Sequence, residues 1–201
     1  MEFLVLGATG RTGSAFTRQA IEKGHRVAAL VRDPSKTSLD GAILTTGDVL
    51  DEAAVRSVVR PQHLIVIALS GASVADGSAN VIRAAAFAGA RRLLGVVGAG
   101  VLQADATRLR NQLPDYPPPL RQIGAGHQAF FDALKSSSLD WTLACTPKLV
   151  EGPRTDVLRT TADYLPDGTG SVTTEDVAAF LLDEAASPRF IGARVGLNSS
   201  K

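Results

Sequence analysis

Cysteine, aromatic residues and net charge are all scarce in this sequence. The single cysteine, Cys145, excludes an intrachain disulfide and is typical of a reducing compartment. Aromatic residues make up only 5% of the chain, so the core must consist mainly of Ala, Val, Leu and Ile. A net charge of +1 gives no broad attraction to phosphate backbones or anionic lipids. We therefore expect neither nucleic acid nor a membrane as a partner.

Long hydrophobic runs are also missing. The longest apolar stretches, at 64–69 and 93–102, are far shorter than the roughly 20 residues that span a bilayer. The N-terminal apolar run lacks the basic lead of a signal peptide and continues directly into a glycine motif. We therefore expect a cytoplasmic protein. The length of 201 residues predicts a single domain over 1–201.

What the sequence does contain is an alternation of short apolar runs with longer alanine-rich segments. This pattern is typical of parallel strands joined by crossover helices, and continuously apolar runs indicate strands buried on both faces. We predict an α/β fold, a Rossmann-type doubly wound parallel sheet with helices on both faces. The predicted strands lie at 2–6, 26–31, 42–45, 64–68, 92–97 and 141–145, with a short strand at the end of the chain, and the predicted helices at about 11–23, 51–58, 75–88, 120–136 and 174–186.

Two segments interrupt the alternation. The first, 103–119, ends in three consecutive prolines, which we expect to block both a helix and a strand, so it is predicted to be a loop or lid. The second, 146–173, is also rich in proline and glycine and is predicted to be irregular. In this fold, ligands bind at the carboxyl ends of the strands, where the order reverses between the first and fourth strands. Loops at about 98–119 and 146–170 are then expected to form the substrate side.

A glycine motif with the spacing GxxGxxG gives the strongest functional signal. It follows the first predicted strand and opens the first predicted helix, as a phosphate-binding turn requires. We expect Gly7 to allow a sharp turn, Gly10 to let a pyrophosphate approach and Gly13 to let the helix pack on the sheet. The alternative is a tight turn without a ligand. The motif predicts a dinucleotide site formed by Gly7, Ala8, Thr9, Gly10, Arg11, Thr12 and Gly13.

The end of the second predicted strand indicates which dinucleotide binds. Arg32 stands where a guanidinium would pair with a 2′-phosphate, and Arg11 could reach the same group. This arrangement favours NADP(H) as the cofactor. In the alternative interpretation both arginines are ordinary solvated charges, and Asp33 binds the ribose hydroxyl of NAD(H).

The motifs together resemble those of atypical short-chain dehydrogenase/reductases, particularly the biliverdin reductase B (flavin reductase) and NmrA-like NAD(P)-binding proteins. The resemblance covers nearly the whole chain and rests on GATGRTG at 7–13, LVRDPSK at 30–36, GDVLD at 47–51 and TPKLVEGP at 146–153. It implies that Asp48 and Val49 lie against the adenine. Asp48 could instead cap a helix, and Ser70 and Gly71 could belong to a plain loop. The further cofactor-binding residues that it implies are Ala68, Leu69, Ser70, Gly71 and Pro147.

The tyrosine and lysine pair of conventional short-chain dehydrogenases is missing. That pair is four residues apart on one helix, and neither Tyr116 nor Tyr164 is followed by a lysine at this spacing. The serine that the family places after the fifth strand is also absent, because Gly98, Ala99 and Gly100 stand there. Alcohol dehydrogenation is therefore disfavoured.

A flavin or quinone could still accept hydride, because such a ring can take its proton from water. We expect the glycines at 98 and 100 to leave room for a flat ring. Lys148 is a candidate catalytic residue that could attract an anionic acceptor, unless it is a solvated loop lysine. His127 resembles a histidine of biliverdin reductase B relatives and could donate a hydrogen bond or proton, or serve only a structural role.

The sequence thus predicts an NADPH-dependent reductase, with a non-catalytic NmrA-like NADP(H) sensor as the alternative. An epimerase-like enzyme is disfavoured by the missing pair. No metal site is expected, since His25, His63 and His127 lie on separate elements, and Cys145 is expected to be a buried, inert thiol. The helical pattern allows a homodimer, because faces buried in a core and in a dimer look alike.

Overall fold

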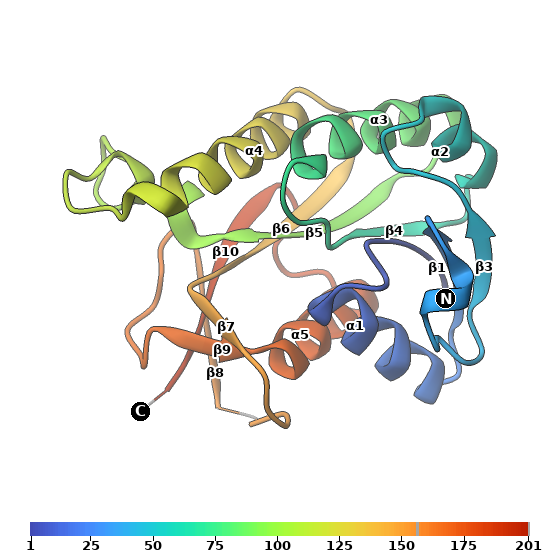
Figure 1. The fold of residues 1–201 in the computed structure, drawn as a ribbon. Helices are drawn as coiled ribbons and strands as arrows, with labels where there is room; N and C mark the ends of the chain where they lie inside the picture. The colour runs from blue at the N-terminus through green and yellow to red at the C-terminus, as the bar shows by residue number, and fades with distance from the viewer. Residues whose placement is uncertain (156, 201) are drawn as a thin grey trace.

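The computed structural model describes residues 1–155 and 157–200, the side chain of residue 122 excepted. A central sheet of eight strands, in the order β3-β2-β1-β4-β5-β6-β10-β8, separates two layers of helices. All neighbouring strands are parallel except β8, which is antiparallel to β10. Helices α2, α3 and α4 cover one face of the sheet, and α1 and α5 cover the other (Figure 1). The predicted Rossmann-type fold is confirmed.

The elements have the following bounds. The strands of the sheet are β1 (Glu2–Leu6), β2 (Arg26–Val31), β3 (Ile43–Thr46), β4 (Leu64–Ile67), β5 (Arg92–Gly98), β6 (Asp140–Thr146), β8 (Leu158–Ala162) and β10 (Ala193–Ser199). The helices are α1 (Arg11–Glu22), α2 (Glu52–Val58), α3 (Ser73–Ala88), α4 (Pro118–Lys135) and α5 (Thr174–Ala186). A second, two-stranded sheet pairs β7 (Lys148–Val150) with β9 (Ser171–Thr173).

Each face of the sheet has its own hydrophobic core. Phe130 of α4 belongs to the core on the face that α2, α3 and α4 cover. The absence of a side chain at Gly95 of β5 makes room for its ring. On the opposite face, Phe3 of β1 meets Phe16 of α1 edge to face, with 5.0 Å between ring centroids. Because both faces are buried, the central strands are continuously apolar, which is the pattern that predicted them.

The three prolines at 117–119 begin a helix, whereas the sequence predicted that they would block one. Pro117 is the N-cap of α4, and Pro118 and Pro119 form its first turn, so the helix begins two residues before the predicted position. Proline is well suited to a first helical turn, because the N–H groups there have no partner within the helix and the φ of proline is already helical. The segment before Pro117 is irregular apart from two single-turn helices, η2 (Ala99–Val101) and η3 (Arg110–Gln112).

The prediction of an irregular segment at 146–173 is wrong in part. It contains β7, β8 and β9, of which β7 and β9 pair with each other and β8 forms the edge of the main sheet beside β10. These strands have three to five residues each, so their pairing depends on contacts distant in sequence. Within the described residues, no helix combines the length and apolar character needed to cross a bilayer.

Candidate functional site

A cleft of about 920 Å³ opens at the carboxyl ends of the central parallel strands. The sheet order reverses at the same place, because β1 pairs with β2 on one side and with β4 on the other. The start of α1 and the segments after β4, β5 and β6 form the cleft wall. The first three turns of α4 and the loop before it complete the wall. Among the predicted site residues, the cleft brings together Gly10, Arg11, Thr12, Ala68, Leu69, Ser70, Gly71, His127, Pro147 and Lys148.

The glycine motif forms a turn that tolerates no side chain at two of its positions. Gly7 has φ +87, and a Cβ placed there would lie 2.4 Å from the carbonyl oxygen of Ala68. A Cβ on Gly13 would lie 2.1 Å from the carbonyl oxygen of Gly7. The turn therefore brings the end of β1, the end of β4 and the first turn of α1 into direct backbone contact.

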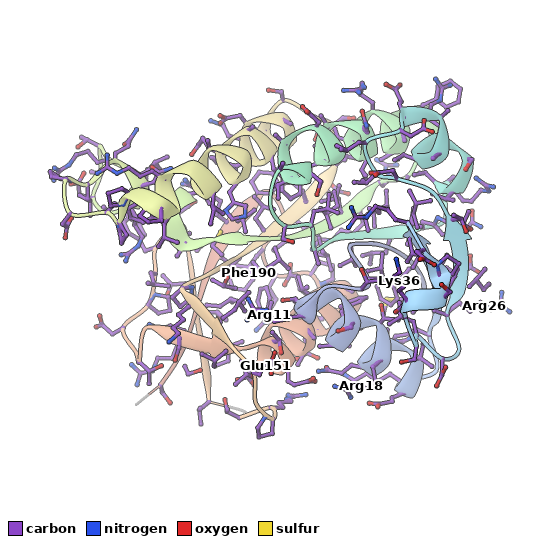
Figure 2. All side chains as sticks on the ribbon, in the orientation of Figure 1. Arg11, Arg18, Arg26, Lys36, Glu151 and Phe190 are labelled. Carbon is purple, nitrogen blue, oxygen red and sulfur yellow. The ribbon has the colours of Figure 1, made fainter. Side chains whose placement is uncertain are left out.

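The amino end of α1 is open toward the cleft. Gly10 is its N-cap, no side chain caps it, and its first turn holds no acidic residue. The uncapped N–H groups and the positive end of the helix dipole suit a pyrophosphate. Arg11, the first residue of the helix, lines the cleft and lies at the centre of the molecule in Figure 2.

Arg32 and Asp33, which follow β2, have different surroundings. The Asp33 carboxylate accepts hydrogen bonds from the Ser35 hydroxyl at 2.6 Å and the Ser35 amide at 3.0 Å, and it pairs with Lys36 at 3.1 Å. The bond from the Ser35 hydroxyl, followed by that from Lys36, lowers the pKa of Asp33. Arg32 is exposed and makes no ion pair in the described part of the chain.

Asp48 and Val49 lie outside the cleft wall. Asp48 accepts the Leu50 amide at 2.9 Å, while Asp51 caps α2 by accepting the amides of its first turn. The alternative that Asp48 caps this helix is therefore wrong. Val49 packs against α3 at Gly77, where a Cβ would lie 2.8 Å from its Cγ1, and its carbonyl accepts the Asn80 amide at 3.0 Å. The remaining predicted residues outside the wall are Gly7, Ala8, Thr9, Gly13 and Arg32.

His127 of α4 lies against the backbone of Gly98, the last residue of β5. Its Nδ1 accepts the Gly98 amide at 3.2 Å, which assigns the ring proton of the neutral form to Nε2. Burial lowers the pKa of this histidine, so the imidazole is neutral at neutral pH. A neutral imidazole is a hydrogen-bond donor rather than a strong acid, and this fixes what His127 can contribute to the cleft.

Lys148 is the first residue of β7 and is exposed at the cleft wall. Its backbone amide donates to the Gly170 carbonyl at 3.2 Å, beside the β7–β9 ladder. Leu149 belongs to the same ladder and Pro147 directly precedes it, and both residues lie on the cleft wall. In the residues that the structure describes, the Lys148 ammonium forms no ion pair, so its charge is available at this end of the cleft.

Gly98 and Gly100 both line the cleft, and side chains of the protein lie close to each of them. A Cβ on Gly98 would lie 3.3 Å from His127 Nδ1, and one on Gly100 would lie 2.5 Å from the Tyr116 hydroxyl oxygen. The absence of side chains at the two glycines makes room for these side chains of the protein. Tyr116 is not among the site residues predicted from the sequence, and the glycine at position 100 is the signal that could have indicated it.

Cys145 is fully buried in β6, and burial raises the pKa of its thiol, so it is an inert core residue. Over the described residues, no three His, Cys, Asp or Glu side chains gather in a way that could hold a metal ion. The polar groups of the cleft are backbone amides together with the side chains of Arg11, Thr12, Ser70, Arg110, Asp115, Tyr116, His127, Thr146 and Lys148.

Comparison with known proteins agrees with this geometry. The model of the NAD(P)H-binding family matches residues 7–188. The chain is 27% identical to YwnB of Bacillus subtilis over 94% of this chain and 93% of that protein. It superposes on the anaerobilin reductase ChuY of Escherichia coli with a TM-score of 0.87 and 23% identity, covering 99% and 97% of the two chains. A Streptococcus pneumoniae protein, provisionally described as an NADH-flavin reductase, superposes with a TM-score of 0.84 and 21% identity over 100% of both chains.

Proposed function

This chain belongs to the NAD(P)H-binding family, and we propose that it is an NAD(P)H-dependent reductase that transfers hydride to a small planar acceptor such as a flavin or quinone. One observation carries the proposal. A single cleft of about 920 Å³ joins the glycine turn at one end to His127, Tyr116 and Lys148 at the other. Its volume is at the upper end of the range of about 300–1,000 Å³ for ligand pockets. The reductase names of the two structural neighbours support the same conclusion.

The cofactor half of the proposed site consists mainly of backbone. The amino end of α1 would hold the pyrophosphate, and the segment 68–71 would run beside it. The close backbone packing at Gly7 and Gly13 fits this role, because it fixes the turn before any ligand arrives. When bound, the reduced nicotinamide supplies the hydride.

We further propose that NADPH is preferred over NADH. The Asp33 carboxylate is occupied by Ser35 and Lys36, which disfavours its use as a ribose ligand. Arg32 is next to it and has no ion-pair partner among the described residues, and Arg11 lines the cleft at the start of α1. Two guanidinium groups near the ribose suit a 2′-phosphate, which both can bind through charge-assisted hydrogen bonds.

The acceptor half contributes position and polarity rather than a strong acid. His127 offers a neutral N–H, and the Lys148 ammonium makes this end of the cleft attractive to anionic groups. An acceptor that takes its proton from water fits these groups better than an alcohol or ketone, whose reduction needs a proton donor in the site. This is why we propose flavins and quinones.

Cofactor oxidation with a panel of acceptors tests the proposal. Purified protein is mixed with NADPH or NADH and with riboflavin, flavin mononucleotide or a naphthoquinone, and loss of the reduced-nicotinamide absorbance is followed. We expect turnover above the protein-free background, faster with NADPH. Tight dinucleotide binding by calorimetry without turnover for any acceptor would contradict the reductase and favour a dinucleotide sensor.

A further inference from the structure

The hydroxyl of Tyr116 occupies space that is free because residue 100 is a glycine. An ideal Cβ on Gly100 would lie 2.5 Å from its Oη and 3.1 Å from its Cζ. Any other residue at position 100 would therefore push the phenol away. Both residues line the acceptor end of the cleft, close to His127. The phenol is held against the backbone of η2 rather than projecting from a free loop.

A second set of contacts holds the turn that carries Tyr116. Its amide donates to the Leu113 carbonyl at 3.1 Å, closing the turn before α4. Arg121 of α4 donates to the carbonyls of Leu113 at 2.8 Å, Pro114 at 3.2 Å and Tyr116 at 3.2 Å. Four hydrogen bonds thus fix the backbone at the base of this side chain, which reduces the entropy lost when it binds a ligand.

The phenol is protonated and free to donate. Burial raises the pKa of Tyr116, although the nearby Arg110 opposes the rise. Its hydroxyl makes no hydrogen bond to any described residue and is not a buried, unsatisfied group, so it is accessible from the cleft. The same holds for Nε2 of His127, whose Nδ1 is bound to Gly98. The cleft therefore presents two neutral donors.

An apolar surface lies beside these donors. Leu120 is 45% exposed and Ile123 is 50% exposed, and both line the cleft from the first turns of α4. Leu113 and Pro117 lie on the same wall. A flat ligand with a hydrophobic ring face and a polar edge would match this combination of apolar side chains and N–H and O–H donors.

We propose that Tyr116 determines acceptor specificity: its Oη–H donates a hydrogen bond to a carbonyl oxygen or ring nitrogen of a planar acceptor, alongside Nε2–H of His127. This inference rests on the proposed reductase function and deepens it. When the acceptor ring gains a hydride, the C–H bond of the reduced cofactor breaks, and the cofactor is oxidised by two electrons. Negative charge then collects on the acceptor's carbonyl oxygen or ring nitrogen, where the phenol stabilises it and water supplies the proton.

Two acceptors separate hydrogen bonding from simple packing. A naphthoquinone has carbonyl oxygens, whereas the 10-methylacridinium cation takes hydride on carbon and offers no lone pair. For Tyr116→Phe we expect kcat/KM with the quinone to fall roughly three- to tenfold, the effect of one lost neutral hydrogen bond, and with the acridinium by less than about twofold. Tyr164→Phe, which alters the other tyrosine outside the cleft, should change neither. Equal losses for both acceptors, or no loss for either, would overturn the proposal.

A binding measurement tests the hydrogen bond from Tyr116 to the acceptor independently of turnover. Riboflavin fluorescence is titrated with protein saturated with NADP⁺, which cannot reduce it. We expect the Kd of Tyr116→Phe to be roughly three- to tenfold weaker than that of the wild type and of Tyr164→Phe. If the wild type binds riboflavin but turns over no acceptor, the reductase function fails and Tyr116 is still tested. An unchanged Kd, or no binding by the wild type, would overturn the role of Tyr116.

Discussion

Polar side chains near the cleft differ in how many of their groups already have a partner within the protein. Those partners determine which side chains are free to bind a ligand. Asp33 is satisfied within its own turn by Ser35 and Lys36, while Arg32 beside it has no ion partner among the described residues. At the other end of the cleft, His127 is bound through one nitrogen and free at the other. Because each partner lies within a few residues or on a packed neighbour, these roles follow from local geometry.

Removal of the Arg32 guanidinium should change cofactor choice. For Arg32→Ala we expect NADPH binding to weaken by about 1–3 kcal/mol, the range of charge-assisted hydrogen bonds, with NADH binding nearly unchanged. Calorimetric titration with both dinucleotides measures this. Arg91→Ala is the matched control, because Arg91 is exposed just before the amino end of β5, whereas Arg32 follows the carboxyl end of β2. Equal losses for NADPH and NADH would show that Arg32 does not contact a 2′-phosphate.

Among the elements, α1 has a tightly restricted position, because its first turn touches the backbone of the preceding turn. In Gly13→Ala the new methyl group would meet the Gly7 carbonyl oxygen at 2.1 Å. The helix must then move, and we expect a loss of about 1–3 kcal/mol in unfolding free energy, together with weaker dinucleotide binding. Urea unfolding and calorimetry provide the two measurements.

Gly124→Ala is the corresponding control within α4. A Cβ there meets no atom within 4 Å, so alanine should stabilise the protein by roughly 0.5–1 kcal/mol through its greater helix propensity. A Gly13→Ala variant as stable as the wild type would show that α1 can shift at little cost. The predicted rigidity of the glycine turn would then be wrong.

The elements show how far a sequence of this kind can be interpreted. Strands β1 to β6 lie within one residue of their predicted limits, and the helices within two, because most of these elements have an apolar pattern of their own. By contrast, β8 has the sequence LRTTA and is recognisable only through its pairing with β10. The position of Tyr116 over Gly100 depends in the same way on a contact across 16 residues, which no local pattern reports.

In the molecule as a whole, a buried carboxylate connects the later strands. Glu184 of α5 is 0% exposed and accepts hydrogen bonds from Arg92 at 3.1 Å and from Thr142 at 3.2 Å. It also accepts the backbone amides of Arg189 and Phe190. The charge is thus fully satisfied, and it joins β5, β6 and α5 to the turn that leads into β10.

Mild acid should destabilise the protein through its histidines. Burial is the main cause of the lowered pKa values of His25, His63 and His127. The unfolded chain therefore binds protons more readily, and stability falls as the pH drops through the ordinary histidine range near 6.5. Asp33 and Glu175, whose pKa values are also lowered, stay ionised there.

Urea unfolding at about pH 7.5 and about pH 5.5 should accordingly give a smaller unfolding free energy at the lower pH. His127→Gln should reduce this difference, because one of the three groups no longer takes up a proton on unfolding. An unfolding free energy that stays constant or rises on acidification would contradict the prediction.

The place of β10 in the sheet has a consequence for biosynthesis. Residues 193–199 lie between β6 and β8, so a strand translated after both of its neighbours occupies the position between them. Until it leaves the ribosome, β8 has no neighbour in the sheet and the edge of β6 stays unpaired. A nascent chain must therefore carry an open strand edge from the emergence of β6 until β10 emerges, and such an edge is prone to aggregation unless a chaperone protects it.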